Sequence, residues 1–151
     1  MAIDRMDWHW DSAEKAYREC TGNRDELTEE QQDEIQHYAA DHIGLFLRWI
    51  IDNGFEGTDE DIIDQSECER VRRGDMSGTD YFLNNCDGKF WEDDLCESII
   101  PFVNEYYEQY LRDYMVVIAE GECYTLLSGD KEYNMIRPVI DRAYENFTMK
   151  K

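Results

Sequence analysis

The stretch that decides the fold is HYAADHIGLFLRWIIDNGF, which runs from His37 to Phe55. Apolar residues recur in and just before it at steps of three and four, which is the period of an α-helix. The pattern predicts one helix of about 25 residues that follows Thr28 and ends before Gly54. Thr28 and Gln31 have the spacing of a capping box. The predicted apolar stripe contains Ile35, Tyr38, Ala39, His42, Ile43, Phe46, Trp49 and Ile50.

Helix signals also dominate the rest of the chain. Gly44 lies within the stripe, and we expect a second helix to cross closely there. A first predicted helix is capped by Asp11 with Glu14 and runs through Cys20, and another is opened by Thr58 and Asp61 and runs to Arg73 before Gly74. A short predicted helix begins at Ser77. A long predicted helix is capped by Ser98 with Pro101 in its first turn, and a last one has Pro138 near its start. The segment ECYTLL, residues 122–127, is compatible with a short strand. We therefore predict a mainly α fold, a single compact domain over residues 1–151 with about five or six helices and at most a short strand or hairpin.

The histidines of the opening stretch do not have the spacing of a metal site on one helix. His37 and His42 are five residues apart, roughly 140° around a helix, whereas a zinc-binding helix needs an i, i+4 pair. His42 belongs to the apolar stripe, which favours a buried, hydrogen-bonded core histidine. His37 and Asp41 do have i, i+4 spacing, which suits a weak surface pair.

The stretch DWHW, from Asp7 to Trp10, has two interpretations. The tryptophans around His9 could form a stacking pocket, or they could pack the N-terminus onto the core. Packing is the favoured interpretation, because large aromatic side chains mostly serve packing. No calcium-binding loop, phosphate-binding loop or nucleophile motif is present, since the acids after Thr58 lack the spacing of an EF-hand. We expect no enzyme activity and assign no catalytic, cofactor-binding or metal-binding residue.

Charge is the outstanding global feature of the chain. It has 36 Asp and Glu against 15 Lys and Arg, a formal charge of −21, and residues 25–69 contain fifteen acids with Arg48 as their one base. Phosphates would be repelled, so we expect neither nucleic-acid binding nor binding to an anionic membrane. The five cysteines form no CxxC pair, and neither a secretion signal nor a membrane-spanning run is recognisable. These features predict a cytoplasmic protein with reduced thiols.

Several stretches resemble one known family. They are DRMDWH at residues 4–9, DHIGLFLRWIIDNGF at 41–55, GTDYFLNNCDGKFWEDDL at 78–95, FVNEYYEQYLRDY at 102–114 and YNMIRPVIDRAYENF at 133–147. The chain resembles an uncharacterised family of small acidic bacterial proteins, and its most specific motif is H-I-G-x-F-L-x-W from His42 to Trp49. The family has a loop with glycine and proline after the Trp-His pair, where this chain has the acidic, helix-forming residues 10–34. The resemblance implies a cytoplasmic bacterial protein, and similar proteins occur beside polymorphic toxin genes, where they are taken to be immunity proteins. It transfers no catalytic residue.

The leading hypothesis is an immunity protein that binds a cognate toxin domain, itself basic and directed at nucleic acid. An acidic surface would speed the encounter with such a partner. The expected contact set is Glu29, Glu30, Asp33, Glu34, Asp59, Glu60, Asp61 and Asp64. One alternative is a small-ligand binder or enzyme with a pocket formed by Trp8, His9, Trp10 and His42. A second is an inhibitor that mimics nucleic acid, with carboxylates spaced like phosphates. Runs of acids are also common as plain solvated faces. The sequence leaves monomer and homodimer equally open.

Overall fold

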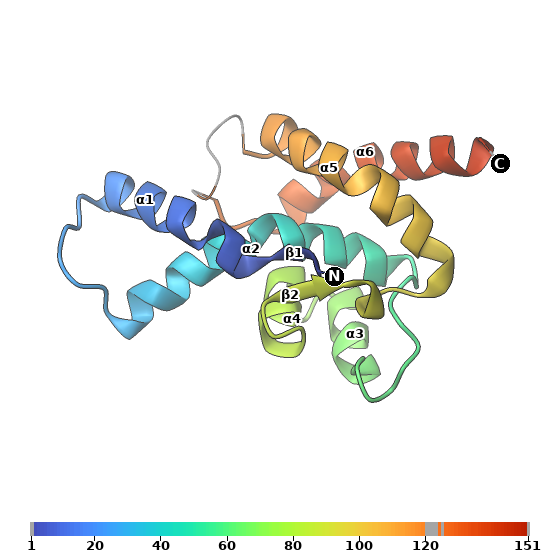
Figure 1. The fold of residues 1–151 in the computed structure, drawn as a ribbon, viewed down its shortest axis with the longest axis horizontal. Coiled ribbons are helices and arrows are strands. Elements are labelled where there is room, and N and C mark those ends of the chain that lie inside the picture. Colours follow the sequence, from blue (N-terminus) through green and yellow to red (C-terminus); the bar gives the residue numbers. More distant parts are fainter. Residues whose placement is uncertain (1, 120–123, 125, 151) are drawn as a thin grey trace.

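The computed structural model describes residues 2–119, 124 and 126–150 (Figure 1). The chain folds into a compact, mainly α domain, which confirms the predicted fold class. The regular elements of the described residues are β1 (Ala2–Arg5), α1 (Trp10–Thr21), α2 (Glu29–Asp52), α3 (Gln65–Arg72), α4 (Gly78–Asn85), β2 (Lys89–Trp91), α5 (Ile100–Val117) and α6 (Asp130–Met149). Short 3₁₀ turns are η1 (Met6–His9), η2 (Glu92–Asp94) and η3 (Glu97–Ile99). No helix within these described ranges combines the length and apolar character that crossing a membrane requires.

Helix α2 is the centre of the fold, and its start is the one the sequence predicts. The Thr28 hydroxyl accepts from the backbone N–H of Gln31, and the Gln31 side chain accepts from the N–H of Thr28, so the capping box is confirmed. From Ala39 to Ile51 nearly every side chain is buried, on all faces of the helix. Figure 1 shows the reason, since α5 and α6 lie on one side of α2 while α3 and α4 lie on the other.

The predicted close crossing at Gly44 is present, and its partner is α4. A Cβ on Gly44 would overlap the backbone of Thr79, and a Cβ on Gly78 would overlap the Gly44 carbonyl oxygen. Two backbones can approach this closely only where neither residue has a side chain. The glycine pair therefore sets the distance between α2 and α4.

The N-terminus forms a strand, which the sequence did not indicate. β1 pairs antiparallel with β2, with Asp4 opposite Phe90 and Arg5 opposite Lys89. The register shifts between Ala2 and Asp4, and irregularities of this kind change the direction of a side chain. As a result the Asp4 carboxylate is buried beneath α2 and α5 rather than exposed at the strand edge.

Helices α5 and α6 attach to α2 through aromatic and polar contacts. The Phe46 ring lies 4.7 Å from Tyr110 between centroids, and the Tyr110 hydroxyl donates to the His42 carbonyl oxygen at 2.5 Å. The Trp49 indole N–H donates to Asp141 of α6 at 2.8 Å. These contacts fix the rotation of α2, because each engages a different turn of the helix.

Several predicted helix limits are wrong, for identifiable reasons. Helix α1 begins at Trp10, so Asp11 lies in its first turn and does not cap it. Helix α3 begins only after Asp64, whose side chain accepts from Ser66 and Glu67, so residues 58–64 form turns instead of helix. A stronger cap thus replaces the weaker one at Thr58.

The later helix limits differ as well. Ser98 lies inside the 3₁₀ turn η3 and does not cap α5, although Pro101 does lie in the first turn. Pro138 lies well inside α6, which begins at Asp130. Of the segment considered compatible with a strand, residues 122, 123 and 125 lie outside the described residues, and Tyr124, Leu126 and Leu127 have no strand assignment.

Candidate functional site

Three ionisable side chains, those of Asp4, His9 and His42, come from three different elements and meet in one cluster. His9 Nε2 lies 2.7 Å from Asp4 Oδ1, and His42 Nε2 lies 3.0 Å from Asp4 Oδ2. The two Nε2 atoms are 3.2 Å apart, and the rings meet edge to face at 72°. β1 supplies the carboxylate, η1 one imidazole and the middle of α2 the other. Asp4 and His42 are buried, whereas 18% of the His9 side chain is exposed.

A second set of polar groups holds these three side chains in place. The Tyr107 hydroxyl donates to Asp4 Oδ2 at 2.7 Å, and the backbone N–H of Arg5 donates to Oδ1 at 2.8 Å. His9 Nδ1 lies 2.6 Å from the Tyr124 hydroxyl. Both carboxylate oxygens and both nitrogens of His9 are therefore engaged, which fixes the orientation of the Asp4 and His9 side chains.

Burial and hydrogen bonding set the charges of this cluster in opposite directions. Burial disfavours the Asp4 carboxylate, but the hydrogen bonds and charges of His42 and His9 outweigh it and hold the Asp4 pKa below its usual range. Burial, helped by the charge of His9, lowers the pKa of His42 although Asp4 opposes the shift. At neutral pH the site therefore contains the Asp4 carboxylate beside a neutral His42. The tautomer of His42 decides which of its two ring nitrogens has the free lone pair.

A second buried carboxylate, Asp41, lies one residue before His42. It accepts from the Tyr114 hydroxyl at 2.6 Å and from the backbone N–H and hydroxyl of Ser128 at 2.7 and 2.6 Å. Burial raises the pKa of Asp41, against the lowering effect of Ser128 and Tyr114. These bonds tie α2 to α5 and to the start of α6, so Asp41 has a structural role. The surface pair expected between His37 and Asp41 is absent, because His37 instead contacts the Asp33 carbonyl and Asp80.

The aromatic pocket considered for the N-terminus is brought together only in part. His9 and His42 meet, and Trp10 packs against a small cluster that contains Ala13 and Ile35. The Trp10 indole N–H donates to Glu14 on the same helix. Trp8 is 58% exposed. Trp10 thus seals α1 onto α2, as the favoured interpretation had it, while Trp8 is exposed to solvent.

The eight acids expected to contact a partner lie in two separate patches. We call Glu29, Glu30, Asp33 and Glu34 the helix patch, and Asp59, Glu60, Asp61 and Asp64 the loop patch. The helix patch occupies the first turns of α2, whereas the loop patch follows the other end of this helix, so the long axis of α2, about 36 Å at 1.5 Å per residue, separates them (Figure 1).

Among the described residues, His37 is the one basic side chain within ion-pair distance of the helix patch. All four acids are exposed, and none lies within 4 Å of a nitrogen of any described lysine or arginine. Asp33 reaches His37 at 3.7 Å, and Glu34 lies beside the Tyr17 hydroxyl. The negative charge of these turns is therefore left almost uncompensated.

The loop patch is partly structural. Asp64 caps α3, which lowers its pKa, and Asp59 accepts from the N–H of Asp61 in the turn. Glu60 and Asp61 have no such bond through their side chains in the described structure, and the neighbouring Ile62 is 43% exposed. The patch therefore combines free carboxylates with an accessible apolar side chain.

The three arginines at the end of α3 are paired with acids. The basic triplet at the end of α3 forms ion pairs from Arg70 to Glu67, from Arg72 to Glu56 and Glu69, and from Arg73 to Asp75. Because each guanidinium is already paired with a carboxylate, the triplet offers little to an anionic ligand.

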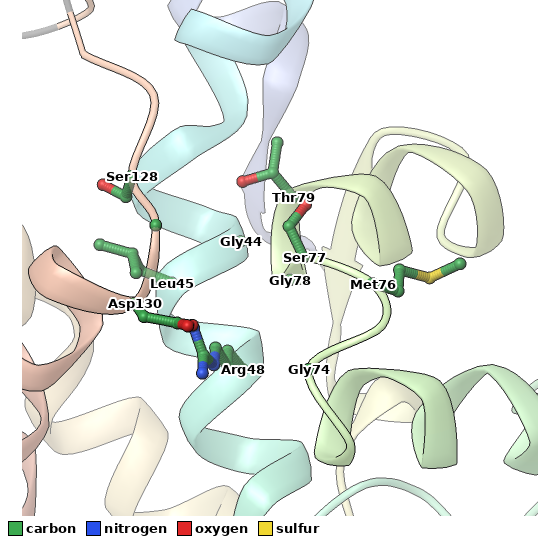
Figure 2. Close-up of a pocket in the computed structure, with 11 residues that line it drawn as sticks. Gly44, Leu45, Arg48, Gly74, Met76, Ser77, Gly78, Thr79, Ser128 and Asp130 are labelled. Carbon is green, nitrogen blue, oxygen red and sulfur yellow. The ribbon is translucent and has the colours of Figure 1, made fainter.

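A small pocket of about 120 Å³ lies where α2, α4 and the start of α6 meet (Figure 2). Figure 2 shows Gly78 of α4 against Gly44 of α2, with Arg48 and Asp130 beside each other. Arg48 Nη1 is 2.9 Å from Asp130, and the guanidinium also lies 4.0 Å from the centre of the Tyr133 ring. Because its cation is already paired, this pocket offers little for an anionic ligand.

Reasoning from the sequence missed Asp4, although the ligand-pocket alternative had placed His9 with His42. The three residues are 5 and 33 positions apart from one another along the chain, and only the strand pairing of β1 turns Asp4 inward. One signal was present, since the chain contains three histidines and two of them lie in the stretches DRMDWH and DHIG. Each stretch also has an aspartate close to its histidine.

The chain belongs to a family of domains of unknown function, DUF7832, whose match covers residues 2–126. This range includes β1 to α5, the Asp4 cluster and both acidic patches, whereas α6 lies beyond it. No curated protein and no solved structure matches the chain.

Proposed function

We propose that this protein is a cytoplasmic immunity protein, which binds a basic toxin domain through its acidic surface and thereby blocks it. The observation that supports this proposal is the helix patch, four exposed acids with no described lysine or arginine in ion-pair range. Such a concentration of charge raises the rate of encounter with a basic protein and makes binding depend on salt.

Charges at the edge of an interface contribute little affinity, so an apolar anchor is also needed. The loop patch offers one in Ile62, which is 43% exposed between Asp61 and Ile63. Beside the helix patch, Tyr17 and Leu27 are half-buried against α2. Either patch therefore combines apolar surface with carboxylates, and a partner need not cover both.

The two alternatives receive different support. Separation of the two patches by the length of α2 does not give the continuous row of carboxylates that a mimic of nucleic acid requires. The ligand-binding alternative is favoured by one observation, the meeting of His9 and His42, but Trp8 and Trp10 face other surroundings.

The test is co-expression with the protein encoded beside this gene, which the proposal expects to contain the toxin domain. We expect the protein to restore growth and to bind that domain directly. A triple reversal in the helix patch, E30K/D33K/E34K, should slow association by about tenfold or more. The matched control is E105K/E108K/E145K, which reverses three exposed acids on α5 and α6.

Two results would contradict the proposal. The neighbouring domain could fail to bind and its toxicity persist, or the control variant could weaken binding as much as the helix-patch variant does. The second result would leave only a general effect of net charge, without a specific surface.

A further inference from the structure

We propose that Asp4, His9 and His42 form a binding site for one divalent transition-metal ion of the borderline class, such as Zn²⁺, Co²⁺ or Ni²⁺. The ligand atoms would be Nε2 of each histidine and the carboxylate of Asp4. Imidazole nitrogens combined with a carboxylate oxygen are a ligand set that such ions prefer.

The distances between the ligand atoms fit an ion at their centre. Metal–ligand bonds of about 2.0–2.2 Å, at angles between octahedral and tetrahedral values, place neighbouring ligand atoms about 2.8–3.5 Å apart. The three separations here are 2.7 Å from His9 to Asp4, 3.0 Å from His42 to Asp4 and 3.2 Å between the two nitrogens. Small shifts of side chains would bring all three into the range.

The surroundings have the second layer of contacts that metal ligands usually have. A metal-bound histidine typically bonds through its other nitrogen, and a metal-bound carboxylate accepts further hydrogen bonds. His9 does so through Nδ1 to the Tyr124 hydroxyl, and Asp4 accepts from Tyr107.

Access and coordination number point to an open site. His42 and Asp4 are buried, but His9 is partly exposed, so an ion could enter past its ring. Three protein ligands leave at least one position for water or another ligand, as in catalytic metal sites and unlike the closed sites of structural zinc. The alternative is that shared protons, without a metal ion, hold the same three groups together. The two alternatives differ in whether the protein binds a metal ion with one-to-one stoichiometry.

The experiment uses the whole protein after removal of metal by a chelator. Calorimetric titration with Zn²⁺ should show one site, and Co²⁺ should give the visible absorption of a bound, low-coordinate ion. H9Q should weaken Zn²⁺ binding by about tenfold or more, and Y107F, which changes only the support of Asp4, should weaken it less. The matched control is H37Q, because His37 is the one other histidine and also contacts an aspartate.

Circular dichroism of each variant separates lost binding from lost folding. If H9Q does not fold, Y107F and the Co²⁺ spectrum of the unchanged protein still decide the question. The proposal is overturned if Zn²⁺, Co²⁺ and Ni²⁺ all fail to bind one to one. It is also overturned if H9Q and H37Q bind alike, since the ion would then be held by acids on the surface. Neither result depends on the immunity role.

Discussion

The two halves of α2 place carboxylates in opposite surroundings. At its start Glu29, Glu30 and Glu34 are exposed, and no described lysine or arginine lies in ion-pair range of them. Seven residues after Glu34, Asp41 is buried and accepts three hydrogen bonds from α5 and the segment before α6. The same residue class thus has two uses. Buried carboxylates hold elements together because each has donors, while exposed ones leave their charge available to a partner.

The largest effect should come from the buried half, at the crossing of α2 and α4. G78A places a methyl group against the Gly44 carbonyl oxygen, and backbone atoms cannot move aside as a flexible side chain would. We expect a loss of about 3 kcal/mol in the free energy of unfolding, measured by urea titration. G22A is the control, since Gly22 has a positive φ but open space around it, and should cost about 1 kcal/mol. Equal losses in the two variants would mean that the crossing is not closely packed.

The next largest effect compares two acids on the same helix. D41A removes the acceptor for Tyr114 and Ser128 and should lower the free energy of unfolding by about 2–3 kcal/mol. E30A, at an exposed position in the first turn, should change it by less than about 0.5 kcal/mol. Chemical denaturation of both variants measures the contrast directly. A stable D41A protein would remove the distinction between buried and exposed acids.

Asp94 is a second buried carboxyl group to compare with Asp41, because fewer hydrogen-bond donors contact it. The backbone N–H of Trp91 donates to it, and burial raises its pKa to about 6. A carboxyl whose pKa is raised on folding binds its proton more tightly in the folded state. Its contribution to stability is therefore complete below about pH 4 and is lost as the pH rises through about 6.

The variant D94N isolates this effect, because the amide oxygen can still accept from Trp91. Between pH 4.5 and 7.5 the wild type should lose roughly 1–3 kcal/mol of stability relative to D94N. Unfolding curves at both pH values measure the difference. A difference that stays constant between them, or that changes in the other direction, would show that Asp94 is ionised in the folded protein throughout this range.

The smallest effect on stability belongs to the helix patch. Reversal of Glu30, Asp33 and Glu34 relieves repulsion among acids but loses their favourable interaction with the N-terminus of α2. These opposing effects should leave the free energy of unfolding within about 1 kcal/mol of the wild type. Thermal and urea unfolding test this. A loss as large as that of D41A would mean that these acids hold the fold.

Local patterns were sufficient to predict the helices but not the contacts between them. The capping box at Thr28 and the end of α2 before Gly54 each depend on one short stretch, so they could be predicted. Gly44 indicated a close crossing, but nothing in its own stretch identified α4 and Gly78 as the partner. The start of α3 was misplaced because two capping residues, Thr58 and Asp64, lie within seven residues, and the stronger cap, Asp64, is the one that the structure uses.

One candidate site could be predicted from local sequence, and the other could not. The exposure of the helix patch follows from its composition, and it was predicted. The cluster of Asp4, His9 and His42 depends on pairing between β1 and β2, which are more than 80 residues apart along the chain. His42 was correctly expected to be buried and hydrogen-bonded, but its partners come from elements whose position no local pattern specifies.

The proposed function requires that the acidic start of α2 meets a basic partner. The most direct test is the association rate of the protein encoded beside this gene, measured from low to physiological salt with the wild type and with E30K/D33K/E34K. We expect a rate that falls steeply with salt for the wild type and a slower, much flatter one for the variant. Identical salt dependence for the two proteins would contradict the claim.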